Sequence, residues 1–362
     1  MSEKTRIQSI RFFEAVSPLS RPIADATHRI PEIRFLVTRL ELVDGTVGEA
    51  YLLAFHYSPR AILGALRDVV ELADGLCASE TGLFNARCEA AHEYFGAVGL
   101  QRWAQGLINL AMWDAWGKHL GQPVWRLLGA HGRRVPVYGS GGWLSYSNDE
   151  LIEEVTGYQR RGFAAVKVKV GSGEPEIDVE RVTRVREAVG DTVRIMVDAN
   201  QGLDFPAALA LANRIRPLGI HWFEEPLART DFEGYRALRQ QAGMALAMGE
   251  REFDLVALRE LAGRQALDLW QPDILRLGGV EGWRESAALA HAHHLPVLPH
   301  YYKEYDAPLC CTVPNAYGVE SFDWVDPIID HPLEIRDGFA LPSERPGWGF
   351  SFREEALKEV KE

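Results

Sequence analysis

Residues 165–170 read AVKVKV and residues 193–200 read VRIMVDAN, with a segment of helical length between them. Both stretches are short, β-branched apolar runs that end in polar residues, as buried strands do. A buried strand, a helix and a second buried strand are typical of a parallel βαβ unit. The two stretches therefore predict neighbouring parallel strands, with Lys169 and Asp198 at their carboxyl ends.

The same alternation runs through the second half of the chain. Short apolar runs occur at residues 135–138, 165–170, 193–197, 220–223, 245–248, 266–270, 296–298 and 317–319. Segments of helical length lie between them, and strands that alternate with helices predict a parallel sheet. Eight such strands indicate a closed barrel of the TIM type. We therefore expect an α/β barrel domain over residues 131–326.

Residues 1–130 follow a different pattern. Residues 33–42 and 47–55 read as two strands joined by a turn at Asp44-Gly45. Residues 100–119 place Leu107, Leu110, Ala111 and Ala115 on one helical stripe. A small antiparallel sheet followed by helices predicts an α+β domain.

The C-terminal segment, residues 327–362, has Gly and Pro turns and a charged end. We expect it to fold back on the N-terminal domain. Because no polar linker divides the chain, we expect the two domains to pack together with a cleft between them.

Composition excludes several classes of protein. The chain has 362 residues, with 39 Lys+Arg against 51 Asp+Glu, so the net charge is −12. An acidic chain without a basic run repels nucleic acid and anionic membranes. No apolar run is long enough to span a bilayer, residues 1–13 lack the core of a signal peptide, and the four cysteines form no C-x-x-C pair. We therefore expect a cytoplasmic enzyme that acts on a small molecule.

Three successive predicted strands end in carboxylates. These are Asp198, Glu224 and Glu250. The carboxyl ends of barrel strands meet at one mouth, so the three side chains would repel one another unless a cation neutralised them. Oxygen ligands without His or Cys favour a hard ion. The pattern therefore predicts a Mg²⁺ site.

Two lysines, an Asp–His pair and one more glutamate are predicted to lie at the same mouth of the barrel. Lys167 and Lys169 share one face of a strand. Beside a cation, we expect their mutual repulsion to lower a lysine pKa enough for it to act as a base; the alternative is that both lysines simply pair with the nearby acids. Asp273 and His300 end neighbouring strands, so the carboxylate can orient the imidazole for proton transfer. Glu320 ends the last strand, as a hydrogen-bond donor if protonated or an acceptor if ionised.

Taken together, these motifs resemble the enolase superfamily, and within it the mandelate racemase subgroup. They are Lys-x-Lys at 167–169, Asp-x-Asn at 198–200, Glu-Glu-Pro at 224–226, Gly-Glu at 249–250, Pro-Asp at 272–273 and His300, in that order. The muconate-lactonising subgroup has a lysine where this chain has Asp273, and enolase itself lacks the Asp–His pair. The resemblance covers nearly the whole chain.

The resemblance implies a modified TIM barrel, (β/α)7β, under a capping domain. It implies that the three carboxylates bind Mg²⁺, that Lys169 and His300 are the two acid/base residues, and that Asp273 supports His300. Lys167 and Glu320 would contact the substrate carboxylate. The shared step is abstraction of the proton next to that carboxylate, which gives an enediolate. Relatives are often octamers, so a homo-oligomer is expected.

Several reactions fit this machinery. A dehydratase expels the hydroxyl of the next carbon, a racemase returns a proton on the other face, and a cycloisomerase acts on a sugar-acid lactone. A non-catalytic barrel that serves as a binding protein is a fourth reading. We favour dehydration of an acid sugar.

The preference comes from residues 17–33, which we expect to form a lid over the mouth. This segment carries Arg21, Asp25, His28 and Arg29, and so polar a lid suits a polyhydroxylated substrate better than an aromatic one. Tyr51, Tyr57 and Trp143 instead favour a substrate like mandelate. The predicted substrate-binding residues are Asn200, Arg29, Tyr51, Ser140 and Trp143.

Overall fold

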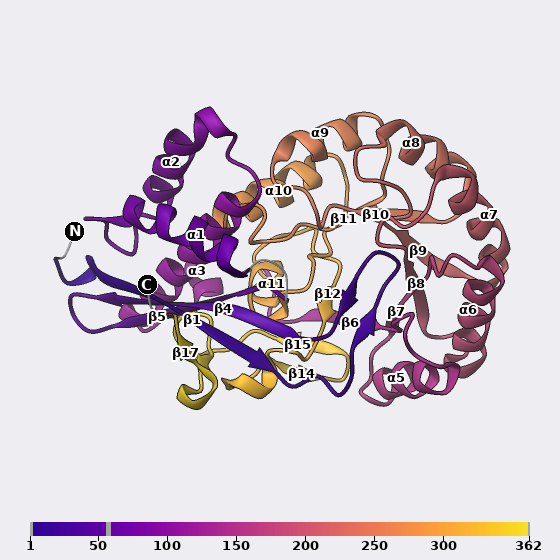
Figure 1. Ribbon diagram of the computed structural model, residues 1–362, viewed down its shortest axis with the longest axis horizontal. Helices are drawn as coiled ribbons and strands as arrows, with labels where there is room; N and C mark the ends of the chain where they lie inside the picture. The colour runs from indigo at the N-terminus through magenta and orange to yellow at the C-terminus, as the bar shows by residue number, and fades with distance from the viewer. Residues whose placement is uncertain (1–2, 56–58, 361–362) are drawn as a thin grey trace.

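The computed structural model describes residues 3–55 and 59–360. It has two domains side by side, a capping domain drawn mainly in violet and a barrel drawn from magenta to orange (Figure 1). The boundary that the sequence predicts near residue 130 lies between α4 (Val124–Leu127) and β6 (Val135–Gly141).

The capping domain is an antiparallel sheet covered by helices. Its strands run in the order β17-β1-β4-β5. The sheet strands are β1 (Ile7–Ser17), β4 (Ile33–Leu42), β5 (Val47–Leu53) and β17 (Lys358–Glu359), and the helices are α1 (Pro59–Val70), α2 (Thr81–His92) and α3 (Leu100–His119). The predicted hairpin and long helix are present, but the sequence analysis missed β1.

Close packing of α3 on β5 holds this domain together. Leu107, Ala111 and Ala115 are fully buried. A Cβ at Gly48 would lie 2.2 Å from the carbonyl oxygen of Ala111, so only glycine lets the strand and the helix approach this closely. The lid carries β2 (Ile23–Ala24) and β3 (Arg29–Ile30), and this indigo segment reaches across to the barrel in Figure 1.

The barrel strands run parallel in the order β12-β6-β7-β8-β9-β10-β11. They are β6 (Val135–Gly141), β7 (Ala165–Lys169), β8 (Arg194–Asp198), β9 (Ile220–Glu224), β10 (Ala245–Met248), β11 (Leu269–Trp270) and β12 (Val319–Ser321). The outer helices are α5 (Asn148–Arg160), α6 (Pro175–Val189), α7 (Phe205–Ile215), α8 (Phe232–Gln241), α9 (Leu255–Gly263) and α10 (Val280–Ala292), whereas α11 (Lys303–Cys310) is buried along its whole length.

Three predicted strands differ from those observed. The run at 266–270 forms a strand only over Leu269–Trp270, and the last strand lies at Val319–Ser321 rather than 317–319. The run at 296–298 contributes only Val297, which bridges Trp270 and Ala316. Prolines at 296 and 299 flank Val297 and have no N–H to extend the hydrogen-bond ladder between strands. At this position, isolated bridges therefore join the neighbouring strands of the barrel.

The C-terminal segment returns to the capping domain. Strand β17 pairs with β1, while β15 (Phe339–Leu341) pairs with β14 (Glu334–Arg336) and with β6. Strand β13 (Ile329–Asp330) pairs with β16 (Ser351–Phe352). Short 3-10 helices lie at Glu3–Thr5, Glu71–Ala73, Glu93–Phe95, Arg216–Leu218, Asp326–Ile328 and Glu354–Ala356.

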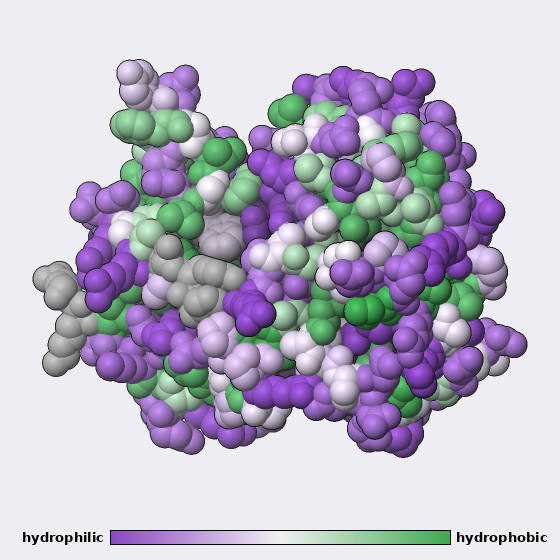
Figure 2. Space-filling view, turned by 45° about the vertical axis from the view of Figure 1, so that its right-hand side comes forward, coloured by the Kyte–Doolittle hydropathy of each residue, from purple (hydrophilic) through white to green (hydrophobic). Residues whose placement is uncertain are grey.

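One apolar core spans both domains, and a second cluster fills the barrel below its mouth. That second cluster consists of Tyr138, Met196, Trp222, Ala247, Leu269 and Leu298. Hydrophilic residues predominate over the outer helices in Figure 2, which also shows a notch between the α2 end of the capping domain and the barrel. Among the described residues, no helix is long and apolar enough to cross a membrane.

Candidate active site

Three carboxylates converge at the barrel mouth. Asp198 ends β8, Glu224 ends β9, and Glu250 follows β10. All three are buried, and one oxygen from each lies within 4.8 Å of the others. This is the arrangement that the strand ends predicted.

Neighbouring groups fix the orientation of these carboxylates. Glu224 accepts hydrogen bonds from the indole N–H of Trp222 at 3.0 Å and from Nε2 of Gln271 at 2.6 Å. Asp198 accepts one from the backbone N–H of Asn200 at 2.8 Å. Burial raises the pKa of Glu224 to about 7, although Lys167 opposes the shift. Such a crowded, all-oxygen set fits a hard divalent cation such as Mg²⁺.

The two lysines of β7 contact the triad directly. Lys167 is paired with Glu224, and its Nζ lies 2.7 Å from Oε1 of Glu320. Nζ of Lys169 lies 2.5 Å from Oδ2 of Asp198 and 5.3 Å from the centre of the Trp143 ring. Both side chains are buried, so the lysines are held against the carboxylates rather than in solvent.

The carboxylates of the triad set the pKa values of the two lysines when no cation neutralises them. Burial acts to lower the pKa of Lys167 and of Lys169, but the nearby carboxylates outweigh it and hold both pKa values above their ordinary range. Lys167 also acts to lower the pKa of Lys169, as predicted, yet less strongly than Asp198 raises it. The lowered lysine pKa that the sequence predicts beside a bound cation stays a prediction, because it depends on that cation neutralising the triad.

His300 and Asp273 form the predicted pair. Nδ1 of His300 lies 2.9 Å from Oδ2 of Asp273, and Nε2 faces Oε2 of Glu250 at 3.7 Å. Burial acts to lower the pKa of His300, but Glu250 and Asp273 outweigh it and raise that pKa. His300 therefore stands at the Glu250 end of the triad, and Lys169 stands at the Asp198 end.

Glu320 serves as an acceptor. It accepts the backbone N–H of Tyr301 at 2.9 Å as well as the Lys167 ammonium group. Burial acts to raise the pKa of Glu320, but Lys167 and His300 outweigh it and lower that pKa. Of the two roles left open by the sequence, the ionised one agrees with these contacts.

A cavity of about 450 Å³ lies above these groups, between the two domains. Asp25 and His28 of the lid line it, as do Asn200 and Trp143. The capping domain also contributes an apolar wall made by Leu53, Ala54, Phe55, Ile62, Leu100 and Trp103, and Phe322 and Trp324 continue that wall on the barrel side. The cavity therefore has a polar base, polar residues of the lid at one side and an apolar wall on the side of the capping domain.

Three predicted substrate-binding residues lie elsewhere. Tyr51 is buried beneath the site, where its hydroxyl donates to Glu304 at 2.5 Å. Ser140 has a buried hydroxyl outside the cavity lining. Arg29 is exposed and lines a separate depression between the lid and barrel residues 144–145 and 171–172. Tyr57 lies outside the described residues.

Strand geometry explains these three errors. Successive residues of a strand point to opposite faces, so a position close in sequence to the mouth can still face the core or the solvent. The sequence analysis also missed Trp103, Arg251 and Arg276, which line the cavity. Arg251 and Arg276 directly follow the motifs at Glu250 and Asp273, and that position was the available clue, whereas Trp103 reaches the cavity only through domain packing.

Family comparisons agree with this geometry. Residues 7–129 match the family described as mandelate racemase / muconate lactonizing enzyme, N-terminal domain. Residues 150–356 match the family described as enolase C-terminal domain-like. The chain belongs to the enolase superfamily.

Members of the superfamily resemble the chain over most of its length. An L-talarate/galactarate dehydratase of Salmonella typhimurium is 32% identical, over 98% of this chain and 90% of that protein. An arabinonate dehydratase of Saccharolobus solfataricus is 30% identical, over 74% of each chain. The crystal structure of an L-talarate dehydratase from Polaromonas sp. JS666, complexed with Mg and L-glucarate, has a TM-score of 0.89 and 31% identity, over 98% of this chain and 99% of that one.

Proposed function

We propose that the protein dehydrates an acid sugar and uses Mg²⁺ held by Asp198, Glu224 and Glu250. One observation carries the proposal: Lys169 and His300 stand at opposite ends of one carboxylate triad, at the base of one cavity. The similarity to the acid-sugar dehydratases supports this reaction over the other reactions of the superfamily.

In this proposal each side chain has a defined task. Lys169 takes the proton next to the substrate carboxylate, and Lys167 donates a hydrogen bond to a carboxylate oxygen. A divalent cation on the triad supplies positive charge that stabilises the developing oxyanion and lowers the pKa of the adjacent lysine. His300, oriented by Asp273, donates a proton to the hydroxyl of the next carbon, which leaves as water.

Mass spectrometry tests the reaction. The protein is incubated with Mg²⁺ and a stereochemical panel of acid sugars, and the expected result is a product lighter by one water. Lys169→Ala and His300→Asn each abolish this product while circular dichroism stays unchanged. Exchange of the α-hydrogen with deuterated solvent, without dehydration of any acid sugar, would establish a racemase instead.

We infer a cytoplasmic location and a homo-oligomeric assembly. The cysteines among the described residues are free, in keeping with a cytoplasmic location. We infer a homo-oligomer, an octamer being the form expected from the family resemblance. Light scattering of the purified protein measures the assembly directly, and a monomer would contradict the inference.

A further inference from the structure

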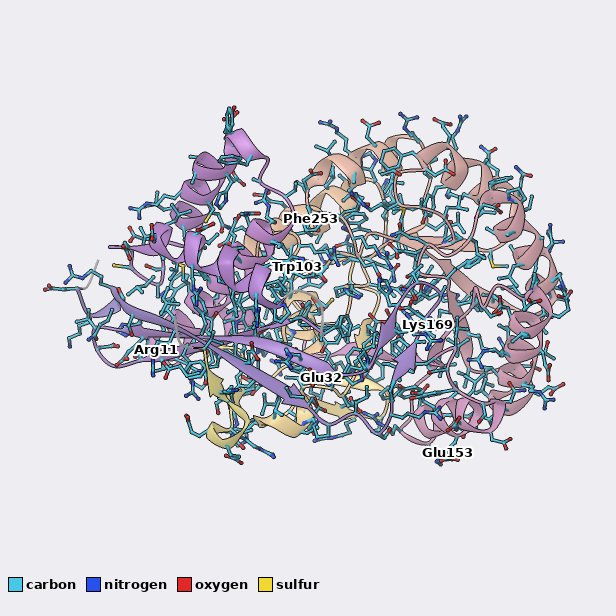
Figure 3. The ribbon with its side chains drawn as sticks, viewed as in Figure 1. Arg11, Glu32, Trp103, Glu153, Lys169 and Phe253 are labelled. Carbon is cyan, nitrogen blue, oxygen red and sulfur yellow. The ribbon has the colours of Figure 1, made fainter. Side chains whose placement is uncertain are left out.

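Two arginines line the cavity outside the triad and the proposed acid/base machinery. Arg251 is paired with Glu225 and Glu250, which leaves Arg276 as the arginine with no close carboxylate partner among the described residues. Arg276 lines the cavity on the Asp273 side, and its guanidinium carbon lies 4.7 Å from the centre of the Trp103 ring and 5.3 Å from that of Phe253. Figure 3 shows Trp103 and Phe253 close together where the two domains meet. The two rings therefore hold the guanidinium group at the domain junction.

Two hydrogen-bond donors here lack an acceptor. Nε of Arg276 and Nε1 of Trp103 are buried, and no acceptor among the described residues lies within hydrogen-bond distance of either. A buried donor without a partner is costly, and such groups in native proteins call for an explanation. Both residues line the cavity, so a bound molecule can supply the missing acceptor once the side chains turn these N–H groups towards it.

Asp273 does not supply that acceptor. Its Oδ2 lies 3.9 Å from Nε of Arg276 and is already paired with His300 at 2.9 Å. Its Oδ1 accepts the backbone N–H groups of Leu275 and of Arg276 itself, each at 2.9 Å. The position of Asp273 therefore depends on backbone donors that survive replacement of the Arg276 side chain.

The charges around Arg276 favour the binding of an anion. Glu252, a nearby carboxyl group on which Arg276 acts, already pairs with Arg229 at 2.9 Å. Helix α3 begins at Leu100, which lines the cavity together with Trp103. The positive end of the helix dipole is thus on the same side.

We propose that Arg276 and the indole N–H of Trp103 bind a second carboxylate at the far end of the substrate, which makes the substrate a dicarboxylic acid sugar. This inference rests on the proposed function. The first carboxylate occupies the polar base, and the carbon chain extends from there towards Arg276. A planar guanidinium group matches a carboxylate with two parallel hydrogen bonds, whereas a terminal hydroxyl cannot form this charged pair.

Matched substrates test the proposal. Each diacid is compared with the monoacid of the same configuration, which differs only in its terminal group. The wild type is expected to favour the diacid in kcat/KM. Arg276→Met is expected to lower kcat/KM for the diacid by about 10- to 100-fold, the size of a lost charged hydrogen bond, and to leave the monoacid within about threefold.

Two further variants sharpen the test. Trp103→Phe keeps the ring and removes only the N–H, so the diacid is expected to lose about 3- to 10-fold. Arg214→Met is the control, because Arg214 pairs with Glu176 on the outside of the barrel, and it is expected to behave as the wild type. An equal loss for both substrates in Arg276→Met would show a positioning role towards Asp273 and overturn the proposal, as would a wild type that favours the monoacid.

Calorimetry separates this proposal from the proposed reaction. With Mg²⁺ present, His300→Asn is titrated with each diacid and its matched monoacid, with and without Arg276→Met. Tighter binding of the diacid that Arg276→Met abolishes supports the second-carboxylate site even if no acid sugar is dehydrated. Equal binding of the two ligands overturns the site and leaves the dehydration result untouched.

Discussion

At the scale of single residues, the triad makes a testable statement about metal binding. A cation that binds only the native state stabilises it by mass action, so Mg²⁺ is expected to raise the melting temperature and EDTA to lower it. Asp198→Asn removes a ligand, and we expect the variant to lose the response to Mg²⁺. Glu176→Gln, at an exposed acid on α6, is the matched control and keeps the response. A full response in Asp198→Asn would contradict the metal site.

Some residues of the site could be predicted from the sequence, and others could not. Asp198, Glu224 and His300 were predictable because strands of a parallel barrel end at one mouth, so position in a strand fixes position in the site. Tyr51 was misplaced because the face of a short buried strand cannot be read from an apolar run. Trp103 was missed because its place in the cavity depends on how two domains dock, which no local pattern encodes.

At the scale of elements, the loop after β6 depends on a buried carboxyl group. Glu154 of α5 accepts the backbone N–H of Gly142 at 2.5 Å, and buried Arg181 donates to the carbonyl groups of Gly142 and Trp143. Burial raises the pKa of Glu154 to about 7. These contacts hold Trp143 over Lys169.

The raised pKa predicts a dependence of stability on pH. The folded state binds the Glu154 proton more tightly than the unfolded state, so this contribution is complete below about pH 4.5 and is lost as the pH rises through about 7. Glu154→Gln keeps an acceptor for Gly142 but does not titrate. Between pH 5 and 8, the free energy of unfolding of the wild type is expected to fall relative to that of Glu154→Gln, by at most about 3 kcal/mol. Parallel curves in urea titrations would contradict this.

Strand prediction at this scale succeeded where apolar runs are long and bounded by turns. The hairpin of β4 and β5 and the barrel strand β10 follow from pattern alone. Strand β1 was missed because charged residues interrupt its apolar ones: its sequence, IQSIRFFEAVS, has a largely half-exposed burial pattern. Its partner β4 is mostly buried, and its apolar pattern is clear in the sequence. The two strands have similar lengths, so burial and not length decided which of them could be predicted.

At the scale of the whole molecule, the C-terminal segment joins the two domains. The indole N–H of Trp348 donates to the carbonyl oxygen of Leu110 in α3 at 2.9 Å, and its ring packs edge-on against Tyr305 in α11, with centroids 5.0 Å apart. Its backbone N–H donates to Asp114 at 2.8 Å. One buried side chain therefore contacts a helix of the capping domain and a helix of the barrel.

Because the cavity lies between the domains, loss of this contact is expected to weaken both the fold and the site. Trp348→Ala is expected to destabilise the protein by about 3–5 kcal/mol, the usual cost of removing a buried aromatic ring, and to lower kcat/KM as the walls of the cavity separate. Trp348→Phe keeps most of the packing and is expected to lose only about 1 kcal/mol with the hydrogen bond. Denaturant unfolding and steady-state kinetics measure the two effects. If Trp348→Ala halved the free energy of unfolding but left kcat/KM unchanged, the C-terminal segment would not position the capping domain over the cavity. That result would contradict the prediction.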